Sequence, residues 1–441
     1  MKTLDELKTH AEETLALARK LGASAAEVSV SQSLGLDVTV RQQDVETVEF
    51  NQHTGFSVTL YLGERKGSAS TSDLSPHAIS QTLKAALNIA NYTQPDEYGG
   101  LAPAELMASK PVDLDLDHPW DLDTVDATAL GMKCEAAALA VPGILHTEGA
   151  SVGTLRQSAV YGNSHGFVGG RTGTRHGISC AAIAKEDKGL QIDSWSSMAR
   201  DSNRLEDPAI IGQKAATRAV SHLSAKPMET GKMPVLFSPE MSRGLISHLL
   251  GAISGTSIYK RASYLVDRLG ETVASTHFSI HENPLQRAGM GSTWFDADGV
   301  ATDAKPIINK GVLATYLLGA YSARRLGMTS TGNAGGAHNV LLEGTTLSFD
   351  NLLKEMGDGL LVTSLMGQGV NTVTGDYSRG ARGFRIRNGE ITHPVEEITI
   401  ASNLAEMFSH IVAIGDDTDM RGNIQTPSML IESMTVAGNR Q

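Results

Sequence analysis

The residues from Ser238 to Gly251 could carry metal chemistry, because they form a helix-like stretch that contains one histidine, His248. A zinc-binding catalytic helix needs two histidines about one turn apart on one face, with a glutamate beside the first to activate the zinc-bound water. Five residues before His248 stands Arg243, whose charge would repel a zinc ion, and Gly244 follows without a carboxylate. The stretch therefore predicts a helix without a zinc site.

His277 and His281 form the other close pair of histidines. On a helix their spacing would place both side chains on one face, where they could share a metal ion. However, residues 272–280 alternate apolar and polar side chains like a strand, in which the two histidines lie on one side but two pleats apart. We therefore predict neither a metal site nor a catalytic residue in this chain, and a metal ion shared by this pair is the less favoured alternative.

Composition excludes several classes of function. The chain has 441 residues, with 37 Lys and Arg against 49 Asp and Glu, and a formal charge of −12. Nucleic-acid binding needs clustered cations, so we expect no nucleic-acid partner. The first residues lack an apolar signal core, and no window reaches the roughly 18 apolar residues of a membrane helix. These features predict a cytoplasmic protein with no membrane partner. Cys134 and Cys180 lack Cys-x-x-Cys spacing, which disfavours a disulfide framework.

The elements that must position any functional residue can be predicted from hydrophobic spacing. Residues 4–21 have the helical period, and Ser75 followed by Pro76 begins a second helix. Between these helices, five short runs alternate apolar and polar residues as antiparallel strands do. These predicted strands are 27–31, 35–41, 45–50, 55–62 and 66–71.

The same order of elements recurs further along the chain. It consists of a helix over 123–140, strands from 144 to about 197, and a helix over 207–223. A turn predicted at 50–56, with His53, has a counterpart at 161–167, with His165; each begins with an aromatic residue and ends in Gly-Phe. We therefore expect an internal duplication.

Two aperiodic segments suggest how the chain is divided. The Pro-, Asp- and Ala-rich residues 91–120 predict a long surface connection between the repeated units, and a break at 224–231 sets the domain boundary. We predict an α+β fold, with an N-terminal domain (1–226) of helices packed on antiparallel sheets and a C-terminal β-rich domain (227–441) with a few helices. The helices expected in the second domain are 239–250, 315–326 and 351–356.

Several runs of residues are specific in combination. They are NTVTGDYSRG at 371–380, PVEEITIASNL at 394–404, SMTVAG at 433–438, VETVEFN at 45–51 and KGSASTSD at 66–73. Together they resemble the TldD/PmbA family of proteases, in its PmbA (TldE) branch. The metal-binding branch of that family carries a His-Glu-x-x-x-His helix, and this string occurs nowhere in the chain.

The resemblance implies one subunit of a heteromeric zinc metalloprotease. A TldD-type partner would hold the zinc ion with two histidines and a cysteine. This chain would bind no cofactor and would help to form the cleft for an unfolded or extended peptide. Without that partner, two copies of this chain would pair as a homodimer. The alternative is a peptide-binding or assembly protein that acts as a homodimer without proteolysis.

Four residues of these runs are expected to contact a peptide: Tyr377, Ser378, Arg379 and Asn403. They supply an aromatic surface, hydrogen-bond donors and a cation that can hold peptide carbonyls or a terminal carboxylate. A free sheet edge could hold the peptide main chain in the same cleft. The alternative is that residues 375–380 form a turn that packs internally. Glu396 and Glu397 cannot both face a cleft if 395–400 is a strand, because neighbours alternate sides.

Overall fold

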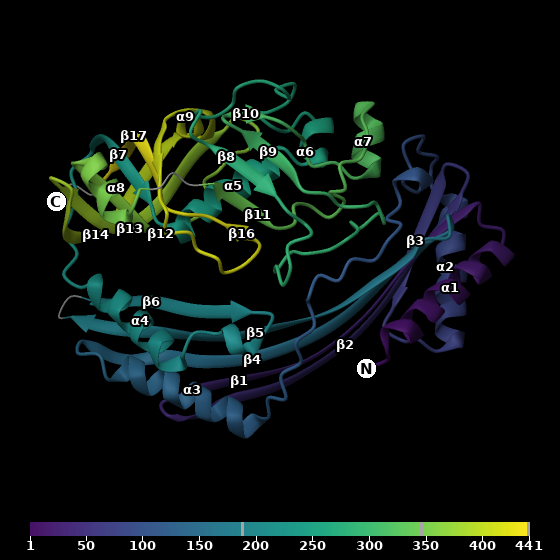
Figure 1. Cartoon of the computed structure of the whole chain (residues 1–441), viewed down its shortest axis with the longest axis horizontal. Helices are drawn as coiled ribbons and strands as arrows, with labels where there is room; N and C mark the ends of the chain where they lie inside the picture. Colours follow the sequence, from purple (N-terminus) through teal and green to yellow (C-terminus); the bar gives the residue numbers. More distant parts are fainter. Residues whose placement is uncertain (187–188, 344–346, 439–441) are drawn as a thin grey trace.

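A helix, three antiparallel strands and a second helix occur twice in the N-terminal half of the protein (Figure 1). The structure is a computed structural model, which describes residues 1–186, 189–343 and 347–438. The first unit comprises α1 (Leu4–Lys20), β1 (Ala25–Arg41), β2 (Asp44–Leu62), β3 (Arg65–Thr71) and α2 (Pro76–Tyr92). The second comprises α3 (Thr124–Leu139), β4 (Ile144–Asn163), β5 (Val168–Glu186), β6 (Gly189–Ala199) and α4 (Pro208–Ser221). This repetition is the duplication that the sequence predicts.

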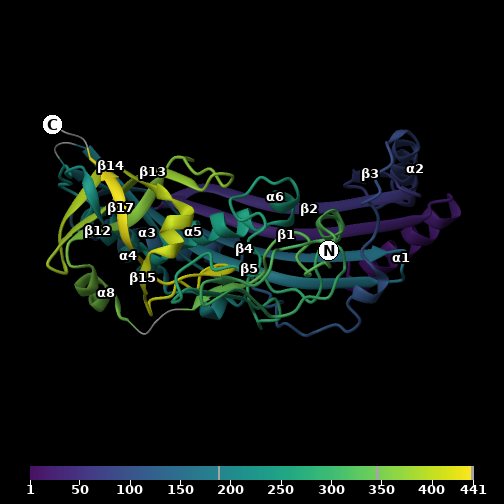
Figure 2. The same ribbon diagram turned by 90° about the horizontal axis from the view of Figure 1, so that it is seen from above.

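The two units share one six-stranded antiparallel sheet, in the order β3-β2-β1-β4-β5-β6. β1 and β4 join the units, with Val30 opposite Val160 and Val38 opposite Val152. Alternate residues of β1 face the helices: Val30 belongs to the core under α1 and α2, and Val38 to the core under α3 and α4. Figure 1 shows these helices on one side of the curved sheet and the C-terminal half on the other, and Figure 2 shows the strands running along the length of the molecule.

The helices of this half begin where the sequence supplies a cap. Thr3 and Glu6 form a capping box at the start of α1, and Ser75 caps α2. Asp123 and Asp207 cap α3 and α4 through their side-chain oxygens. The predicted helix starts in this half are thus confirmed.

The strands are longer than predicted. The breaks expected at residues 32–34 and 51–54 lie inside β1 and β2, which run through them. Gly35 permits a close approach of strands, because a Cβ there would come within 2.9 Å of the Thr154 carbonyl oxygen. The turn predicted at 50–56 is therefore wrong, and His53 lies in a strand. Its expected counterpart does turn after β4, with Gly166 at a φ of 93°.

The C-terminal half contains two sheets. The larger one has the strand order β14-β13-β12-β7-β17-β15, and a further pairing of β14 with β17 closes five of its strands into a ring. Its strands are β7 (Gly231–Phe237), β12 (Gly359–Met366), β13 (Asp376–Arg387), β14 (Glu390–Asn403), β15 (Ile411–Ile414) and β17 (Met429–Ala437). The second sheet comprises β10 (Val312–Leu313), β9 (Lys305–Asn309), β8 (Ser279–Glu282), β11 (Val340–Glu343) and β16 (Ile424–Gln425).

Short helices cover these sheets. They are α5 (Pro239–Ala252), α6 (Gly255–Tyr259), α7 (Ala320–Leu326), α8 (Phe349–Met356) and α9 (Leu404–Ser409). α5 packs on the strand ring through Leu245 and Ile246, which are buried with Phe237 of β7 in the main core. Among the described residues, no helix is long and apolar enough to cross a membrane.

Two predictions for this half need correction. The helix expected at 315–326 begins only at Ala320, because Leu317 is extended and bridges Ser254 in a parallel pair. The expected alternation of side chains between the two faces along residues 395–400 is also wrong. Ala381 pairs with Ile398 while Gly383 pairs with Val395, so β14 has a bulge at residues 396–397, where its side chains do not simply alternate between faces.

The connection between the repeated units is partly buried, contrary to the surface segment that was predicted. Leu114 and Leu116 are buried in a cluster that also contains Trp294 of the C-terminal half. The Arg324 guanidinium donates to three carbonyl oxygens of this connection, at 2.6 Å (Tyr98), 2.8 Å (Gly100) and 3.0 Å (Leu101). The segment therefore helps to hold the two halves together.

Candidate functional site

The four residues predicted to contact a peptide lie at one end of the β13–β14 ribbon. Asp376 is opposite Asn403, Tyr377 opposite Ser402, and Ser378 opposite Ala401. Because residues alternate along β13, Tyr377 and Arg379 share one face, and Ser378 belongs to the other.

Tyr377 and Arg379 lie beside α5. The Tyr377 side chain is 1% exposed, and its ring meets the His248 ring edge-on, with centroids 6.4 Å apart and an interplanar angle of 77°. Burial raises the pKa of Tyr377, although the charge of Arg379 opposes this shift. The pKa of His248 is lowered by burial and by the same guanidinium, so its imidazole is neutral at neutral pH.

Two polar atoms at this place are buried without a hydrogen-bond partner in the described chain: the Tyr377 hydroxyl and Arg379 Nε. An unpaired buried polar group costs about 1–3 kcal/mol, so such groups are uncommon in folded proteins. Both atoms are closed off from solvent, so beside His248 only the half-buried Arg379 side chain is open to a group from another molecule.

Asn403 and Ser378 differ from these two residues. Asn403 Oδ1 accepts a hydrogen bond from the Ala405 amide at 3.0 Å, and Nδ2 donates to the Thr374 carbonyl at 2.9 Å. Asn403 thus caps α9 and fixes the loop before β13. Gly375 of that loop must lack a side chain, because a Cβ there would lie 2.8 Å from Asn403 Oδ1. Ser378 is exposed on the opposite face of the strand.

On α5, the positions that a zinc-binding helix needs for its histidine and its glutamate hold an arginine with other partners and a glycine. Arg243 donates to Asp419 at 2.6 Å and to the Ile424 carbonyl at 3.2 Å. At Gly244 and Gly251 an added Cβ would meet no atom within 4 Å. The face of α5 around His248 therefore has free space on both sides.

The second histidine pair is separated by secondary structure. His277 is exposed in a turn before β8, and His281 lies in β8, with its ring 3.5 Å from the Glu343 carboxylate. The strand predicted over 272–280 begins only at Ser279. In the described ranges, no three His, Cys, Asp or Glu side chains gather in a way that could hold a metal ion.

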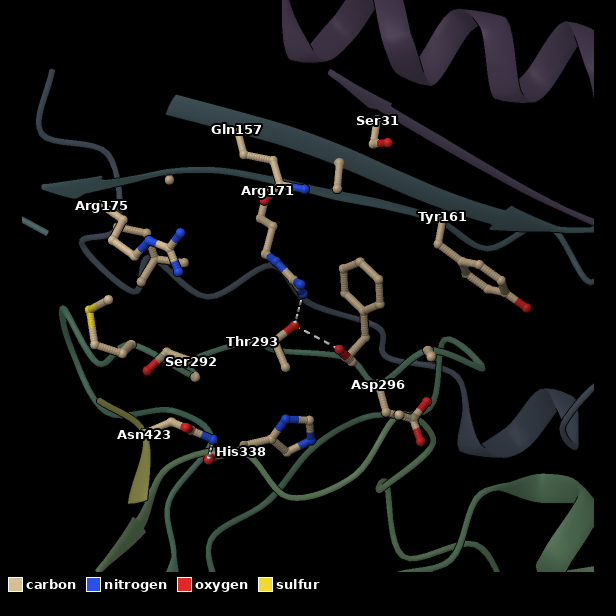
Figure 3. Close-up of a pocket in the computed structure, with 18 of the residues that line it drawn as sticks. Ser31, Gln157, Tyr161, Arg171, Arg175, Ser292, Thr293, Asp296, His338 and Asn423 are labelled. Carbon is tan, nitrogen blue, oxygen red and sulfur yellow. Dashed lines mark hydrogen bonds between the residues drawn. The ribbon is translucent and has the colours of Figure 1, made fainter. Parts of the chain in front are cut away.

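A cavity of about 770 Å³, which was not predicted from the sequence, lies between the bare face of the N-terminal sheet and the C-terminal half (Figure 3). Three arginines line it: Arg171 and Arg175 of β5, and Arg200 after β6. The sequence feature that could have revealed these arginines is the run Arg-Thr-Gly-Thr-Arg at 171–175. Side chains alternate along a strand, so both arginines and the glycine lie on one face.

All three parts of the chain match domains of one known family. Residues 230–438 match the PmbA/TldA metallopeptidase C-terminal domain, residues 117–223 its central domain, and residues 26–90 its domain 1. The chain belongs to the PmbA/TldD metallopeptidase family. It is 46% identical to Metalloprotease PmbA of Escherichia coli O157:H7 over 414 residues, which are 94% of this chain and 92% of that protein. It is 44% identical to a PmbA homologue of Haemophilus influenzae over 98% of this chain and 96% of that protein.

Solved structures agree with this assignment. A protein from Bacteroides thetaiotaomicron, described as a candidate modulator of DNA gyrase, has a TM-score of 0.94 at 28% identity, with 100% of both chains covered. TldE from Thermococcus kodakarensis has a TM-score of 0.84 at 20% identity over 97% of this chain and 100% of that chain, which shows a common fold. A TldD homologue of Buchnera aphidicola is 23% identical over 57% of this chain and 54% of that protein.

Proposed function

We propose that this chain is a subunit without its own zinc site in a metallopeptidase built from two different chains. A TldD-type partner would hold the zinc ion, and this chain would complete the cleft that binds an unfolded or extended peptide. The observation that carries the proposal is the state of α5. Arg243 is held by the Asp419 carboxylate, and Gly244 offers no general base. A zinc-peptidase helix needs histidine and glutamate at such positions.

The proposed peptide contact is the face formed by Tyr377, Arg379 and His248. The Arg379 side chain is half-buried and its guanidinium could donate to a peptide carbonyl, whereas the Tyr377 hydroxyl is buried and would be reached only if the site opened. The free space at Gly244 and Gly251 leaves room for the peptide chain beside α5. In this proposal Asn403 acts indirectly, because it positions the loop before β13, and Ser378 contacts a peptide only from the other face.

The test measures hydrolysis of an unfolded polypeptide, together with bound zinc, for this chain alone and mixed with a TldD-type subunit. We expect activity and stoichiometric zinc only in the mixture. Activity with stoichiometric zinc in this chain alone would overturn the proposal. A mixture that associates and binds zinc without hydrolysing peptide would favour a binding or assembly protein instead.

A variant pair makes the test specific to the proposed contact. Arg379→Gln should lower kcat/KM of the mixture by about tenfold or more, because a charged hydrogen bond to a peptide contributes about 1.5–3 kcal/mol. Arg387→Gln is the matched control. It removes an arginine from the same strand, but Arg387 is exposed and pairs with Asp358 at 3.0 Å. Equal activity of the two mixtures would remove Arg379 from the site.

A further inference from the structure

The cavity between the two halves is lined by the sheet face that carries no helices. Most of the β4 and β5 residues that line it have odd numbers, such as Leu155 and Gln157 on one strand and Arg171 and Arg175 on the next, and these project from the face opposite the helix-covered core. The C-terminal half closes the cavity with loop residues that include Ser292, Thr293, His338 and Asn423 (Figure 3).

Arg200 lies between the other two arginines because β5 leaves room there. Arg171 and Arg175 are four residues apart on β5, about 13 Å along the strand. Gly173 lies between them on the same face, and a Cβ there would come within 2.9 Å of Arg200 Nη1. Arg200 uses this space and donates to the carbonyl oxygens of Thr174, Gly289 and Met290 at 3.0, 3.2 and 2.8 Å.

None of these guanidinium groups forms an ion pair with a carboxylate among the described residues. Arg171 donates to the Thr293 hydroxyl at 2.5 Å, and the Arg175 guanidinium has no hydrogen bond or ion pair with any described group. Burial lowers the pKa of Arg171, and burial together with the charges of Arg171 and Arg175 lowers that of Arg200. The cavity thus concentrates positive charge, although the whole chain has a formal charge of −12.

Other arginines between the halves show that carboxylates were available to this fold. Arg218 and Arg382 both pair with Asp193, at 3.0 and 3.1 Å. The carboxylate that lines the cavity, Asp296, accepts instead from backbone amides of its own turn and of Ala334. Figure 3 shows its carboxylate directed away from Arg171. Unpaired arginines at a cavity are therefore a local feature that requires a separate explanation.

We propose that this cavity binds an oxyanion, a carboxylate or a phosphate, through Arg171 and Arg175, with Arg200 adding its fixed positive charge. Guanidinium groups match both anions with paired hydrogen bonds. The cavity has the size of sites that take small-molecule or short-peptide ligands, so a carboxylate at a peptide end and a free phosphate are both possible sources. The site is separate from the Tyr377 face and does not depend on the proposed peptidase function.

The test is isothermal titration of the full-length chain at constant ionic strength. The probes are sodium phosphate, a short peptide with a free C-terminal carboxylate, and the same peptide with an amidated C-terminus. We expect saturable binding of phosphate, of the free-acid peptide, or of both. Phosphate binding alone identifies a small anion as the ligand, whereas binding of the free-acid peptide without its amide identifies a peptide carboxylate.

Variants decide whether that binding belongs to the cavity. Arg171→Gln combined with Arg175→Gln should weaken binding by about tenfold or more, because charged hydrogen bonds are lost. Arg175→Gln alone should weaken it too, and this change removes no described contact, so the variant should fold. Arg261→Gln is the control, since Arg261 is exposed and pairs only with the exposed Asp267. No binding of any probe, equal binding of the acid and amide peptides without phosphate binding, or unchanged affinity in the variants would overturn the proposal.

Discussion

At the scale of single residues, His222 gives the protein a specific pH dependence. The side chain is 3% exposed and stacks on Phe384 with centroids 4.9 Å apart. Burial and the charges of Arg382 and Arg218 lower the pKa of His222 to about 4, against the opposing charge of Asp193. The unfolded chain binds this proton near pH 6.5 and the folded chain only near pH 4. Stability is therefore lost as pH falls from about 6.5 to about 4, by at most about 3 kcal/mol.

Denaturant unfolding of the wild type and His222→Gln across this pH range checks the prediction. The variant should have a smaller slope of unfolding free energy against pH, with His53→Gln as the control that removes an exposed histidine. Asp296 acts in the opposite direction, because burial raises its pKa to about 7 and stability from this group is lost as pH rises. The contribution of His222 is therefore the difference between the slopes of the variant and of the wild type. Equal slopes would contradict the prediction.

Residue chemistry could be predicted from the sequence where it depends on neighbours along the chain. Arg243 and Gly244 stand where a zinc-peptidase helix carries a histidine ligand and its glutamate, and helical spacing from His248 is enough to recognise these two positions. The contact of Asn403 with the Thr374 carbonyl and the position of Arg200 beside the Gly289 carbonyl join segments that lie far apart in the sequence. Sequence spacing carries no information about those contacts.

At the scale of elements, helix starts were predictable because caps and periods are local signals, whereas strand lengths were not. Gly35 looks like a break in sequence, but here it lets β1 and β4 approach closely. The bulge at 396–397 likewise depends on pairing with β13. Strand continuity is decided by the partner strands, which lie far away in sequence.

The first part of β2 is an unpaired sheet edge. β3 pairs with β2 only from Phe56 onward, so among the described strands residues 44–55 bond to β1 alone. On this edge Phe50 is 72% exposed and Val48 is 39% exposed. Leu34 of the neighbouring β1 is 48% exposed. Open edges with exposed apolar side chains favour association, so we propose that the TldD-type partner of the proposed function covers this edge.

Light scattering and pull-down with a TldD-type subunit test this interface. Phe50→Asp combined with Val48→Lys should weaken association by about tenfold or more, because apolar burial is lost and charge is placed at the edge. Val125→Asp is the matched control, since Val125 is 74% exposed on α3 in the same half of the chain. Unchanged association in the β2 variant would exclude the edge as the interface.

At the scale of the whole molecule, arginines hold the two halves in one arrangement. Arg421 of the C-terminal half donates to Glu240 at 2.7 Å, to Asp419 at 2.9 Å and to the Ser196 carbonyl of β6 at 3.1 Å. Its guanidinium also lies 3.7 Å from the ring centroid of Trp195 in β6. Burial alone would raise the pKa of Asp419, but hydrogen bonds and charge from Arg421 lower it overall. This contact therefore connects the halves across the interface.

Replacing Arg421 should uncouple the halves. Arg421→Met leaves Glu240 and Asp419 without this partner, and removal of one member of a largely buried charge cluster costs about 3–5 kcal/mol, less here because Arg421 is about one-fifth exposed. Tryptophan fluorescence monitors unfolding by denaturant. We expect the wild type to unfold in one transition. The variant should unfold in two transitions that begin at lower denaturant, because each half has its own core. Arg387→Met, which breaks only an exposed pair, should keep one transition. A single transition at the wild-type midpoint in Arg421→Met would show that Arg421 is not needed to couple the halves and that other contacts, such as those of Arg324, are sufficient.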